Sequence, residues 1–465
     1  MNAILLTAVL GVIMMLGGAF IKNKSYPGWI AIIGLAGIII ANCIELKTGM
    51  SFFSVDVKDM LHTNSFNLTF LTVALGCTLL YFLLNRKEFE KVGDNVSEYF
   101  ALIFFSLCGV SIAATFNTLL MLFIGIEILT IPLYILTGSD KHNLKSNEAA
   151  LKYFLMGVFS TGIMLMGIAF LYGGNDTGSF FINHIHIGEG KLFPMIAIGL
   201  VLLLIALSFK VSAAPFHFWT PDVYDGAPTV FTSFMASIVK VAAFFAFLRL
   251  FENSFGTMQA QWQKLIVIIT AATLLIGNLT AVFQQSVKRM LAYSSIAQAG
   301  FMLFALFALN ETAKEGLVLY AAAYSLASIG IFAVLVKMKD YTVDGFNGLG
   351  KKQPVLAFTA TIFLLSLTGI PLTAGFQAKF YMLLAAEQTG HYSWLVILAV
   401  LCAAISAYYY FRIIQAIYFK EPGEGEQVVG EISTAFKALL VITAILILVL
   451  GVFPSLLTDW LYYYS

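Results

Sequence analysis

Stretches of about 20 apolar residues recur along the whole 465-residue chain, and they constrain its fold more than any other feature. Each stretch is long enough to cross a bilayer as an α-helix, and the ten-residue alternation of a membrane β-barrel is absent. Charged residues make up only 11% of the chain, whereas soluble domains carry about a quarter. The sequence therefore predicts an all-α polytopic membrane protein, and its net charge of +1 gives no support to nucleic-acid binding.

The apolar stretches predict fourteen spans joined by short connections, which leave no room for a soluble catalytic domain. No nucleotide-binding motif of the G-x-x-x-x-G-K-[ST] or G-x-G-x-x-G type occurs. The first span has no basic n-region or cleavage site, so we expect it to be retained. The predicted spans are 3–21, 28–46, 67–85, 98–115, 117–137, 149–172, 193–224 (broken), 228–251, 264–284, 291–309, 315–337, 355–386 (broken), 393–419 and 436–460.

The distribution of Lys and Arg between loops predicts the orientation. Loops after odd-numbered spans hold sixteen of these residues, and loops after even-numbered spans hold six. Since basic loops stay in the cytoplasm, we expect the odd-numbered loops to face inward and both termini to face outward.

A few charged side chains fall inside predicted spans, and these are the candidate functional residues. A lysine at the centre of a membrane helix costs about 2.5–3.5 kcal/mol, so such residues commonly mark proton or ion pathways. Lys152 has two interpretations that stay open, because it lies near the start of a span and four residues after Glu148: an anchor at the membrane surface, or a functional charge. The charged residues that we assign to the membrane layer are Glu127, Lys152, Lys210, Lys240 and Lys379.

A glutamate beside a buried lysine can act as a proton switch. Burial disfavours the charged form of a lysine, and a nearby carboxylate favours it. If Glu127 lies close to Lys210, a change in their separation would hold or release the proton. The sequence does not show that the two residues touch.

Two of these lysines lie beside a proline that breaks the helix. Pro215 follows Lys210, and Pro371 precedes Lys379; neither proline can donate a backbone hydrogen bond. Free backbone at this depth is tolerated where protein buries it or water lines it, so we expect hydrated cavities at both breaks. His217 shares the face of Lys210 if the helix continues, and is either a hydrogen-bonded interface residue or a candidate proton relay.

The two broken spans also have similar sequences. "LSFKVSAAPFHF" lies in the seventh span and "LSLTGIPLTAGFQAKF" in the twelfth. Five spans separate them, so the two units would have opposite orientations. Inverted repeats with paired broken helices are typical of transporter cores. Cys43, Cys77, Cys108 and Cys402 each lie alone in an apolar run, which argues against iron–sulfur or structural zinc sites.

Three long motifs resemble a known family. "FKVSAAPFHFWTPDVYDGAPTVFTSFMASIVKVAAFFAFLRL", "GNLTAVFQQSVKRMLAYSSIAQAGFML" and "LSLTGIPLTAGFQAKFYML" are similar to the subunit N family of bacterial NADH–quinone oxidoreductases (respiratory complex I), the counterparts of mitochondrial subunit 2. The resemblance implies an inverted pair of five-helix units, formed by spans 4–8 and 9–13. The chain would then divide into residues 1–97, 98–252, 253–420 and 421–465.

The resemblance also implies roles for the candidate residues. Glu127 would be the fifth-span partner of Lys210, Lys240 would link two half-channels, and Lys379 would lie toward the outward exit. Lys152 would match a sixth-span lysine. Where many relatives have a histidine, this chain has Gln298, which can order water but cannot take up a proton near neutral pH.

The function implied is proton translocation in the bacterial inner membrane, with no cofactor bound by this chain. NADH, FMN, iron–sulfur clusters and quinone would belong to partner subunits, and the membrane neighbours would include subunits M, K and J. Two alternatives stay open: a subunit of a multi-subunit cation/proton antiporter, and a structural spacer of the membrane arm.

Overall fold

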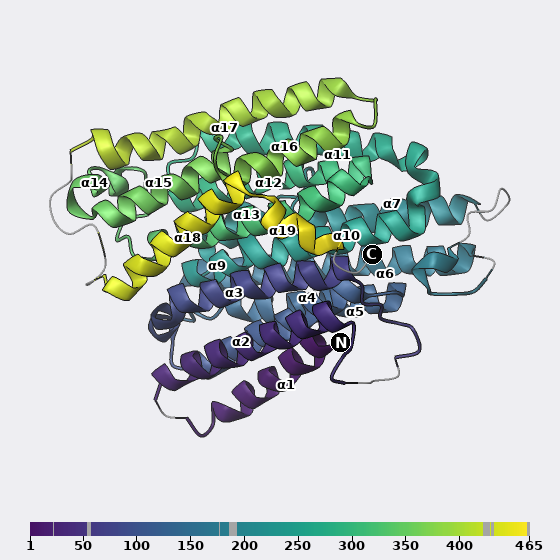
Figure 1. The fold of residues 1–465 in the computed structure, drawn as a ribbon, viewed down its shortest axis with the longest axis horizontal. Helices are drawn as coiled ribbons and strands as arrows, with labels where there is room; N and C mark the ends of the chain where they lie inside the picture. The colour runs from purple at the N-terminus through teal and green to yellow at the C-terminus, as the bar shows by residue number, and fades with distance from the viewer. Residues whose placement is uncertain are drawn as a thin grey trace.

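The computed structural model describes the chain except residues 22, 54–56, 176, 186–192, 422–427, 429–431 and 463–465. Lys22 and Lys191, two of the basic loop residues counted above, lie outside the described residues. The long helices run roughly side by side, and the first helix begins at the end of the bundle where the last described residues lie (Figure 1).

The described helices correspond to the fourteen predicted spans. Eleven are long and apolar enough to cross a membrane, and three shorter apolar helices occupy the first, seventh and twelfth spans. The first half contains α1 (Asn2–Gly17), α2 (Ser25–Thr48), α3 (Ser65–Val92), α4 (Val96–Thr115), α5 (Leu119–Thr137), α6 (Leu144–Gly174), α7 (Phe193–Lys210), α8 (Trp219–Gly226), α9 (Thr229–Phe234) and α10 (Lys240–Phe255). The second half contains α11 (Gln259–Val282), α12 (Val287–Ala308), α13 (Glu311–Val336), α14 (Leu349–Lys352), α15 (Pro354–Thr368), α16 (Ala374–Glu387), α17 (Ser393–Phe419), α18 (Thr434–Val452) and α19 (Ser455–Thr458).

Polar side chains fix several helix starts. The side-chain oxygen of Asn64 accepts a hydrogen bond from the backbone of Asn67 at the start of α3, and Thr118 does the same at the start of α5. Asn310 caps α13 in this way. An N-cap of this kind satisfies one of the four backbone donors that a helix start leaves free. The caps explain why the apolar segments begin as helices at these positions.

The seventh span is broken, as predicted, and its first helix ends at Lys210. Residues 211–218 are not helical, and Ser212 adopts a positive φ of 63°. The backbone N–H of Ala214 donates to Thr273 Oγ1 of α11 at 2.9 Å, and the indole of Trp219 donates to the carbonyl of Phe209 at 3.1 Å. These side chains replace partners that a continuous helix would supply.

The twelfth span also breaks, and there a buried lysine satisfies the free carbonyls. α15 ends at Thr368, followed by Gly369 with φ 88°, and α16 begins at Ala374. Lys379 Nζ donates to the carbonyl oxygens of Leu367 at 2.9 Å and Thr368 at 2.8 Å. The break therefore creates the acceptors that hold this ammonium inside the protein.

A third irregularity was not predicted. The eighth span contains a π-helical turn at Met235–Val239, between α9 and α10, and Lys240 follows this turn directly. π-turns interrupt the regular hydrogen-bond pattern and are frequent at functional sites.

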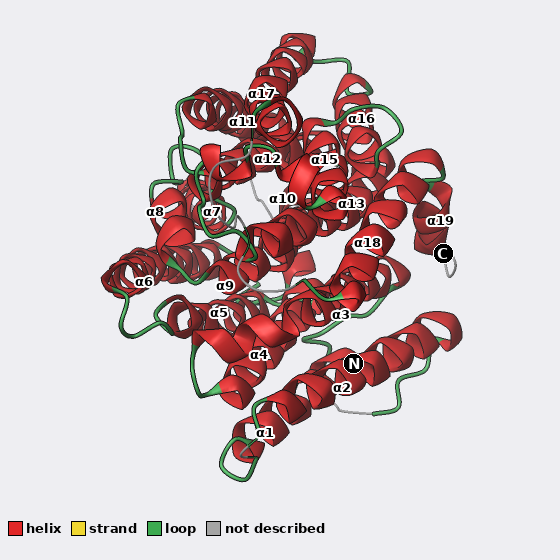
Figure 2. Ribbon diagram, turned by 90° about the vertical axis from the view of Figure 1, so that its left-hand side faces the viewer, coloured by secondary structure: helices red, strands yellow, loops and turns green. Residues whose placement is uncertain are grey.

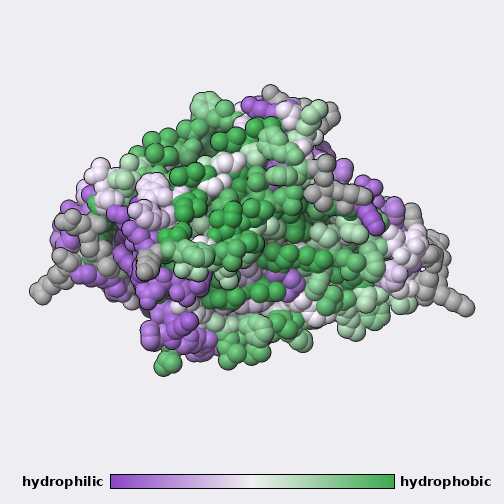
Figure 3. Space-filling model, turned by 90° about the horizontal axis from the view of Figure 1, so that it is seen from below, coloured by the Kyte–Doolittle hydropathy of each residue, from purple (hydrophilic) through white to green (hydrophobic). Residues whose placement is uncertain are grey.

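The interior of the bundle is formed by helices that are buried on all sides. The spans containing α10 and α13 are buried throughout their apolar windows, and both lie at the centre of the end-on view in Figure 2. α6, α11 and α17 expose large apolar residues such as Phe159, Ile268 and Ile397. One face carries hydrophobic residues across its middle and hydrophilic residues toward both ends (Figure 3). This distribution suits a protein surrounded by lipid.

Equivalent helices of the two predicted units pack in the same way. α4 packs on α5 as α11 packs on α12, and α6 packs on α7 as α13 packs on α15 and α16. The exact unit boundaries remain a prediction.

Two expectations about charges and ends were wrong. α18 ends at Val452, ahead of Pro454, so the last span is shorter than 436–460. Glu127 was expected to be the one buried acid, yet its side chain is 19% exposed, whereas Glu45 and Glu88 are buried. Lys152, for which two interpretations were left open, has a side chain that is 44% exposed.

Candidate functional site

Glu127 and Lys210 lie close together, with a threonine bridging them. The Nζ atom of Lys210 is 3.7 Å from Oε1 of Glu127, and the lysine side chain is only 5% exposed. Thr161 of α6 donates to Glu127 Oε1 at 2.7 Å, and its hydroxyl accepts from Lys210 Nζ at 3.3 Å. The contact between Glu127 and Lys210 is thus confirmed. Glu127 lies on α5, Thr161 on α6 and Lys210 on α7.

Lys240 is held without a carboxylate. It is buried, and its Nζ donates to the carbonyl of Ser295 in α12 at 2.9 Å and contacts the hydroxyl of the same serine. The π-turn before Lys240 sets the position from which this side chain reaches α12. Neutral partners of this kind can hold either form of the amine, because the serine hydroxyl both donates and accepts.

Lys210 and Lys240 line the same small cavity. Its volume is about 10 Å³, which is at the threshold for one water molecule. The cavity also has polar groups in its lining, including Thr130, Tyr134 and Tyr224. A single water could therefore stand between the two lysines.

Polar side chains continue from Lys240 toward Lys379. Ser294, next to Ser295, contacts the hydroxyl of Tyr410, which lies 3.5 Å from the Gln298 amide. Gln298 in turn donates to the carbonyl of Leu367 at 2.8 Å. The hydroxyl of Tyr320 donates to the other end of the Gln298 side chain.

Lys379 closes this row of polar groups. Besides the two carbonyls of the break, its ammonium lies 4.6 Å from the centre of the Phe301 ring, a cation–π contact. The structure therefore brings Glu127, Lys210, Lys240 and Lys379 into one row, with Gln298 beside its last member. The three lysine side chains are buried, and that of Glu127 is 19% exposed. Thr161, Ser295, Tyr320 and Tyr410 belong to the row too. Sequence reasoning missed these hydroxyls, because a Ser, Thr or Tyr inside an apolar helix is common.

Lys152 and His217 lie away from this row. Lys152 forms ion pairs with Glu148 at 2.8 Å and Asp222 at 3.1 Å on a partly exposed surface, which favours the anchor interpretation. His217 is 7% exposed and stacks on Phe218, and the break at residues 211–218 removes the helical register that would align it with Lys210. Its Nδ1 has no hydrogen-bond partner among the described residues. A relay role for His217 stays a prediction.

Two buried basic residues were missed by the sequence analysis. Arg249, counted as a loop residue, is 5% exposed and donates to the carbonyls of Ala114 and Phe116 at 2.7 Å each. Lys288 is also buried and donates to the carbonyls of Asp225 and Ala227. Every residue has a backbone carbonyl, so the sequence does not show which carbonyls bind Arg249 and Lys288. Only the position of these two residues near the end of a predicted span could have suggested that they are buried.

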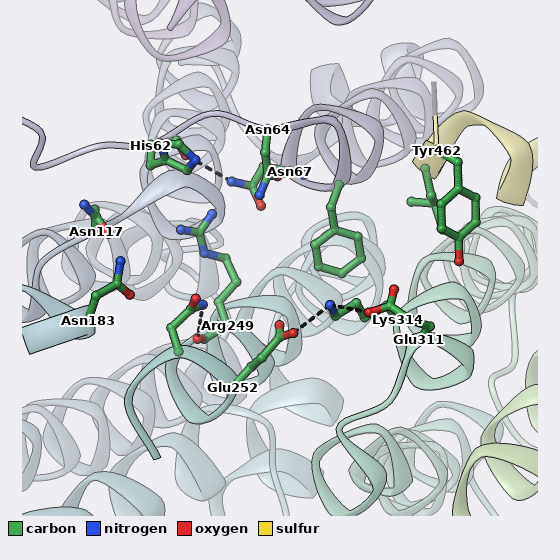
Figure 4. Close-up of a pocket in the computed structure, with 13 residues that line it drawn as sticks. His62, Asn64, Asn67, Asn117, Asn183, Arg249, Glu252, Glu311, Lys314 and Tyr462 are labelled. Carbon is green, nitrogen blue, oxygen red and sulfur yellow. Dashed lines mark hydrogen bonds and ion pairs between the residues drawn. The ribbon is translucent and has the colours of Figure 1, made fainter. Parts of the chain in front are cut away.

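Arg249 lines a polar cavity of about 450 Å³ at the end of the bundle where α10 ends (Figure 4). In this cavity Lys314 stands between Glu252 and Glu311, at 2.7 and 2.9 Å. Between Lys240 and Arg249, α10 carries only apolar, buried residues, Val241 to Leu248. That apolar stretch separates the cavity from the row of lysines.

Comparison with known proteins places the chain in a family. The family model described as NADH:quinone oxidoreductase/Mrp antiporter, TM, matches residues 116–406. The NADH-quinone oxidoreductase subunit N of Cytophaga hutchinsonii is 41% identical over 98% of this chain and 98% of that protein. The chain belongs to the subunit N family.

Solved structures agree with this placement. A chain of respiratory complex I from Thermus thermophilus, in a structure with bound aureothin, is 32% identical, and the match covers 98% of both chains with a TM-score of 0.84. A chain of the Mrp complex from Dietzia sp. has a TM-score of 0.86 at 20% identity, covering 99% of this chain and 96% of that one, and shows that the fold is shared more widely. The subunit N family therefore accounts for the whole length of the chain, including both broken spans.

Proposed function

We propose that this chain is the proton-translocating, antiporter-like subunit N of an NADH–quinone oxidoreductase, and so one subunit of a translocase. The observation that carries the proposal is the row from Glu127 and Lys210 through Lys240 to Lys379. Four ionisable groups at this depth would be costly in a purely structural spacer. NADH, FMN, iron–sulfur clusters and quinone would be handled by partner subunits.

The Glu127–Lys210 pair supplies the switch. Two unit charges about 4 Å apart interact by about 4 kcal/mol at the effective dielectric of a protein, so moving them apart changes where the proton is most stable. The hydroxyl of Thr161 can stay hydrogen-bonded to either Glu127 or Lys210 when they separate, because it already contacts both. Separation of Glu127 from Lys210 would release the lysine proton toward Lys240 through the one-water cavity.

The second half of the row supplies onward transfer. Hydroxyl groups and the Gln298 amide, rather than carboxylates, lie between Lys240 and Lys379. Gln298 would hold these groups and bound water in place without carrying a proton itself. A proton reaching Lys379 would leave on the side where the even-numbered loops lie, which the distribution of basic residues assigns to the outside.

Replacing Glu127 or Lys210 tests whether this row of residues conducts protons. We expect Lys210→Ala and Glu127→Ala to assemble, to retain most NADH oxidation and to lose most of the protons pumped per electron in inverted vesicles. Lys264→Ala, at an exposed position of α11, is the control for loss of a lysine. Full pumping by both assembled variants would contradict the proposal and would favour a spacer.

The antiporter alternative has one observation in its favour, the shared fold of the Dietzia Mrp chain. Copurification separates the two: we expect redox subunits, with membrane subunits M, K and J as neighbours. A complex containing only other antiporter subunits would support the alternative.

A further inference from the structure

The short helix α8 separates two cavities. On its inner side, Trp219 and Tyr224 line the 10 Å³ cavity shared by Lys210 and Lys240. On its outer side, Asp222 and Gly226 line a cavity of about 260 Å³, at the end of the bundle that carries the basic loops. α8 is thus the partition between solvent on that side and the inner lysines.

α8 is not continuous with another helix at either end. Residues 211–218 before it are irregular, and the chain after it turns at Ala227 and Pro228 before α9 begins. An eight-residue helix bounded in this way can shift as a unit, because it is not continuous with a helix on either side.

Three cations hold the outer end of α8. Asp222 Oδ2 is 3.1 Å from Lys152 Nζ of α6, and Asp222 Oδ1 is 3.0 Å from Arg289 Nη1 of α12. Lys288 of α12 binds two backbone carbonyls at the C-terminal end of the helix, those of Asp225 and Ala227. The single carboxylate of Asp222 therefore joins α8 to both predicted five-helix units.

Aromatic side chains lie on the inner side of the ion pairs that Asp222 makes with Lys152 and Arg289. Tyr153, the residue after Lys152, stacks on Trp219 with ring centres 4.7 Å apart and lines the inner cavity. Displacement of Asp222 from Lys152 would move the two partners of this stack apart. Asp222, Lys152 and Arg289 are each 35–44% exposed, and ion pairs in contact with water are weak enough to open and close.

We propose that the Asp222 bridge is a latch: it holds α8 closed over the inner cavity, and its release admits water from the outer cavity to Lys210 and Lys240. The proposal rests on the proposed function, since the admitted water is what would return a proton to the lysines. Asp222 is a positioning residue in this scheme, because it lines the outer cavity and not the inner one.

Thiol labelling tests the latch without relying on pumping. Thr130 is buried and lines the inner cavity, so Thr130→Cys, with the four native cysteines replaced by alanine, reports access to it. The intact complex in inverted vesicles is treated with a small neutral methanethiosulfonate. We expect Asp222→Asn to accelerate labelling at least tenfold, and Asp222→Glu to stay close to the parent rate.

A surface ion pair on the same side provides the matched control. Asp94 pairs with Lys24, whose hydrogen bond and charge lower the pKa of the Asp94 carboxyl, so this residue is a charged partner as Asp222 is. Asp94→Asn removes a bridge that borders neither cavity, and we expect no change in labelling. Lys152→Met, which removes one arm of the latch, serves as a second variant and should give an intermediate acceleration.

The outcomes separate this proposal from the one it rests on. Labelling of Asp222→Asn and Lys152→Met within twofold of the parent would overturn the latch, whatever the pumping. Accelerated labelling would support the latch even if Lys210→Ala and Glu127→Ala pumped fully, an outcome that would overturn the proton role of the lysines alone.

Discussion

Lys379 and Gln298 share one acceptor, the carbonyl oxygen of Leu367, at 2.9 and 2.8 Å. This carbonyl is free because α15 ends one residue later. The helix break, the buried ammonium and the Gln298 amide are therefore parts of one arrangement. Gln298 holds the end of the broken helix in the orientation that also binds Lys379.

Replacement of Gln298 tests this arrangement. We expect Gln298→Leu to lower the protons pumped per electron by more than half while NADH oxidation continues, because leucine cannot hold the carbonyl or bridge to Tyr410. Gln298→His, which retains a donor, should keep most of the pumping. Proton uptake by inverted vesicles, divided by NADH oxidised, measures both variants. A fully pumping leucine variant would show that the amide is dispensable.

The second prediction concerns Thr161, whose hydroxyl forms hydrogen bonds with both Glu127 and Lys210. Thr161→Val keeps the shape of the side chain and removes the hydroxyl. We expect it to slow NADH-driven proton pumping several-fold, whereas Thr161→Ser should pump close to the parent rate. Equal rates in the valine and serine variants would mean that Glu127 and Lys210 exchange protons without the bridge.

Much of this site could be predicted from the sequence, since its charges stand out in apolar spans. Glu127, Lys210, Lys240 and Lys379 were identified in this way, and Pro215 and Pro371 located the breaks. The first break begins directly after Lys210 and the second begins at Gly369, and neither end follows from a proline alone. At the second break, Lys379 binds the carbonyls of Leu367 and Thr368 at the end of α15.

Other features depend on contacts that a sequence does not encode locally. The π-turn at Met235–Val239 has no composition of its own, because it is set by packing around α10. Arg249 and Lys288 bind backbone carbonyls, which every residue has. Lys152 was assigned to the membrane layer because hydropathy measures the position of a residue along the chain and not the reach of its side chain.

Arg249 gives a prediction about stability rather than pumping. Hydrogen bonds to a charged group contribute about 1.5–3 kcal/mol each, and Arg249 makes two, so Arg249→Met should lower the free energy of unfolding by about 3–6 kcal/mol. We expect less assembled complex and a lower thermal midpoint, with an unchanged ratio of protons to electrons. Lys264→Met, at an exposed position, is the control. A changed ratio would connect the 450 Å³ cavity beside Arg249 to the lysine row after all.

Gly369 offers the sharpest test of how the second break positions its lysine. Its φ of 88° disfavours any other residue, and a Cβ atom would come within 2.9 Å of Lys379 Cδ. Gly390 has a similar φ of 69° but nothing within 4 Å of a Cβ atom, so Gly390→Ala carries the same backbone penalty, about 1–2 kcal/mol, without touching a lysine. We expect Gly369→Ala to reduce pumping at least fivefold and Gly390→Ala to pump normally, at matched amounts of assembled complex. Since the two alanine variants differ mainly in what the new methyl group meets, equal pumping in both would show that the position of Lys379 against the Leu367 and Thr368 carbonyls does not control proton transfer.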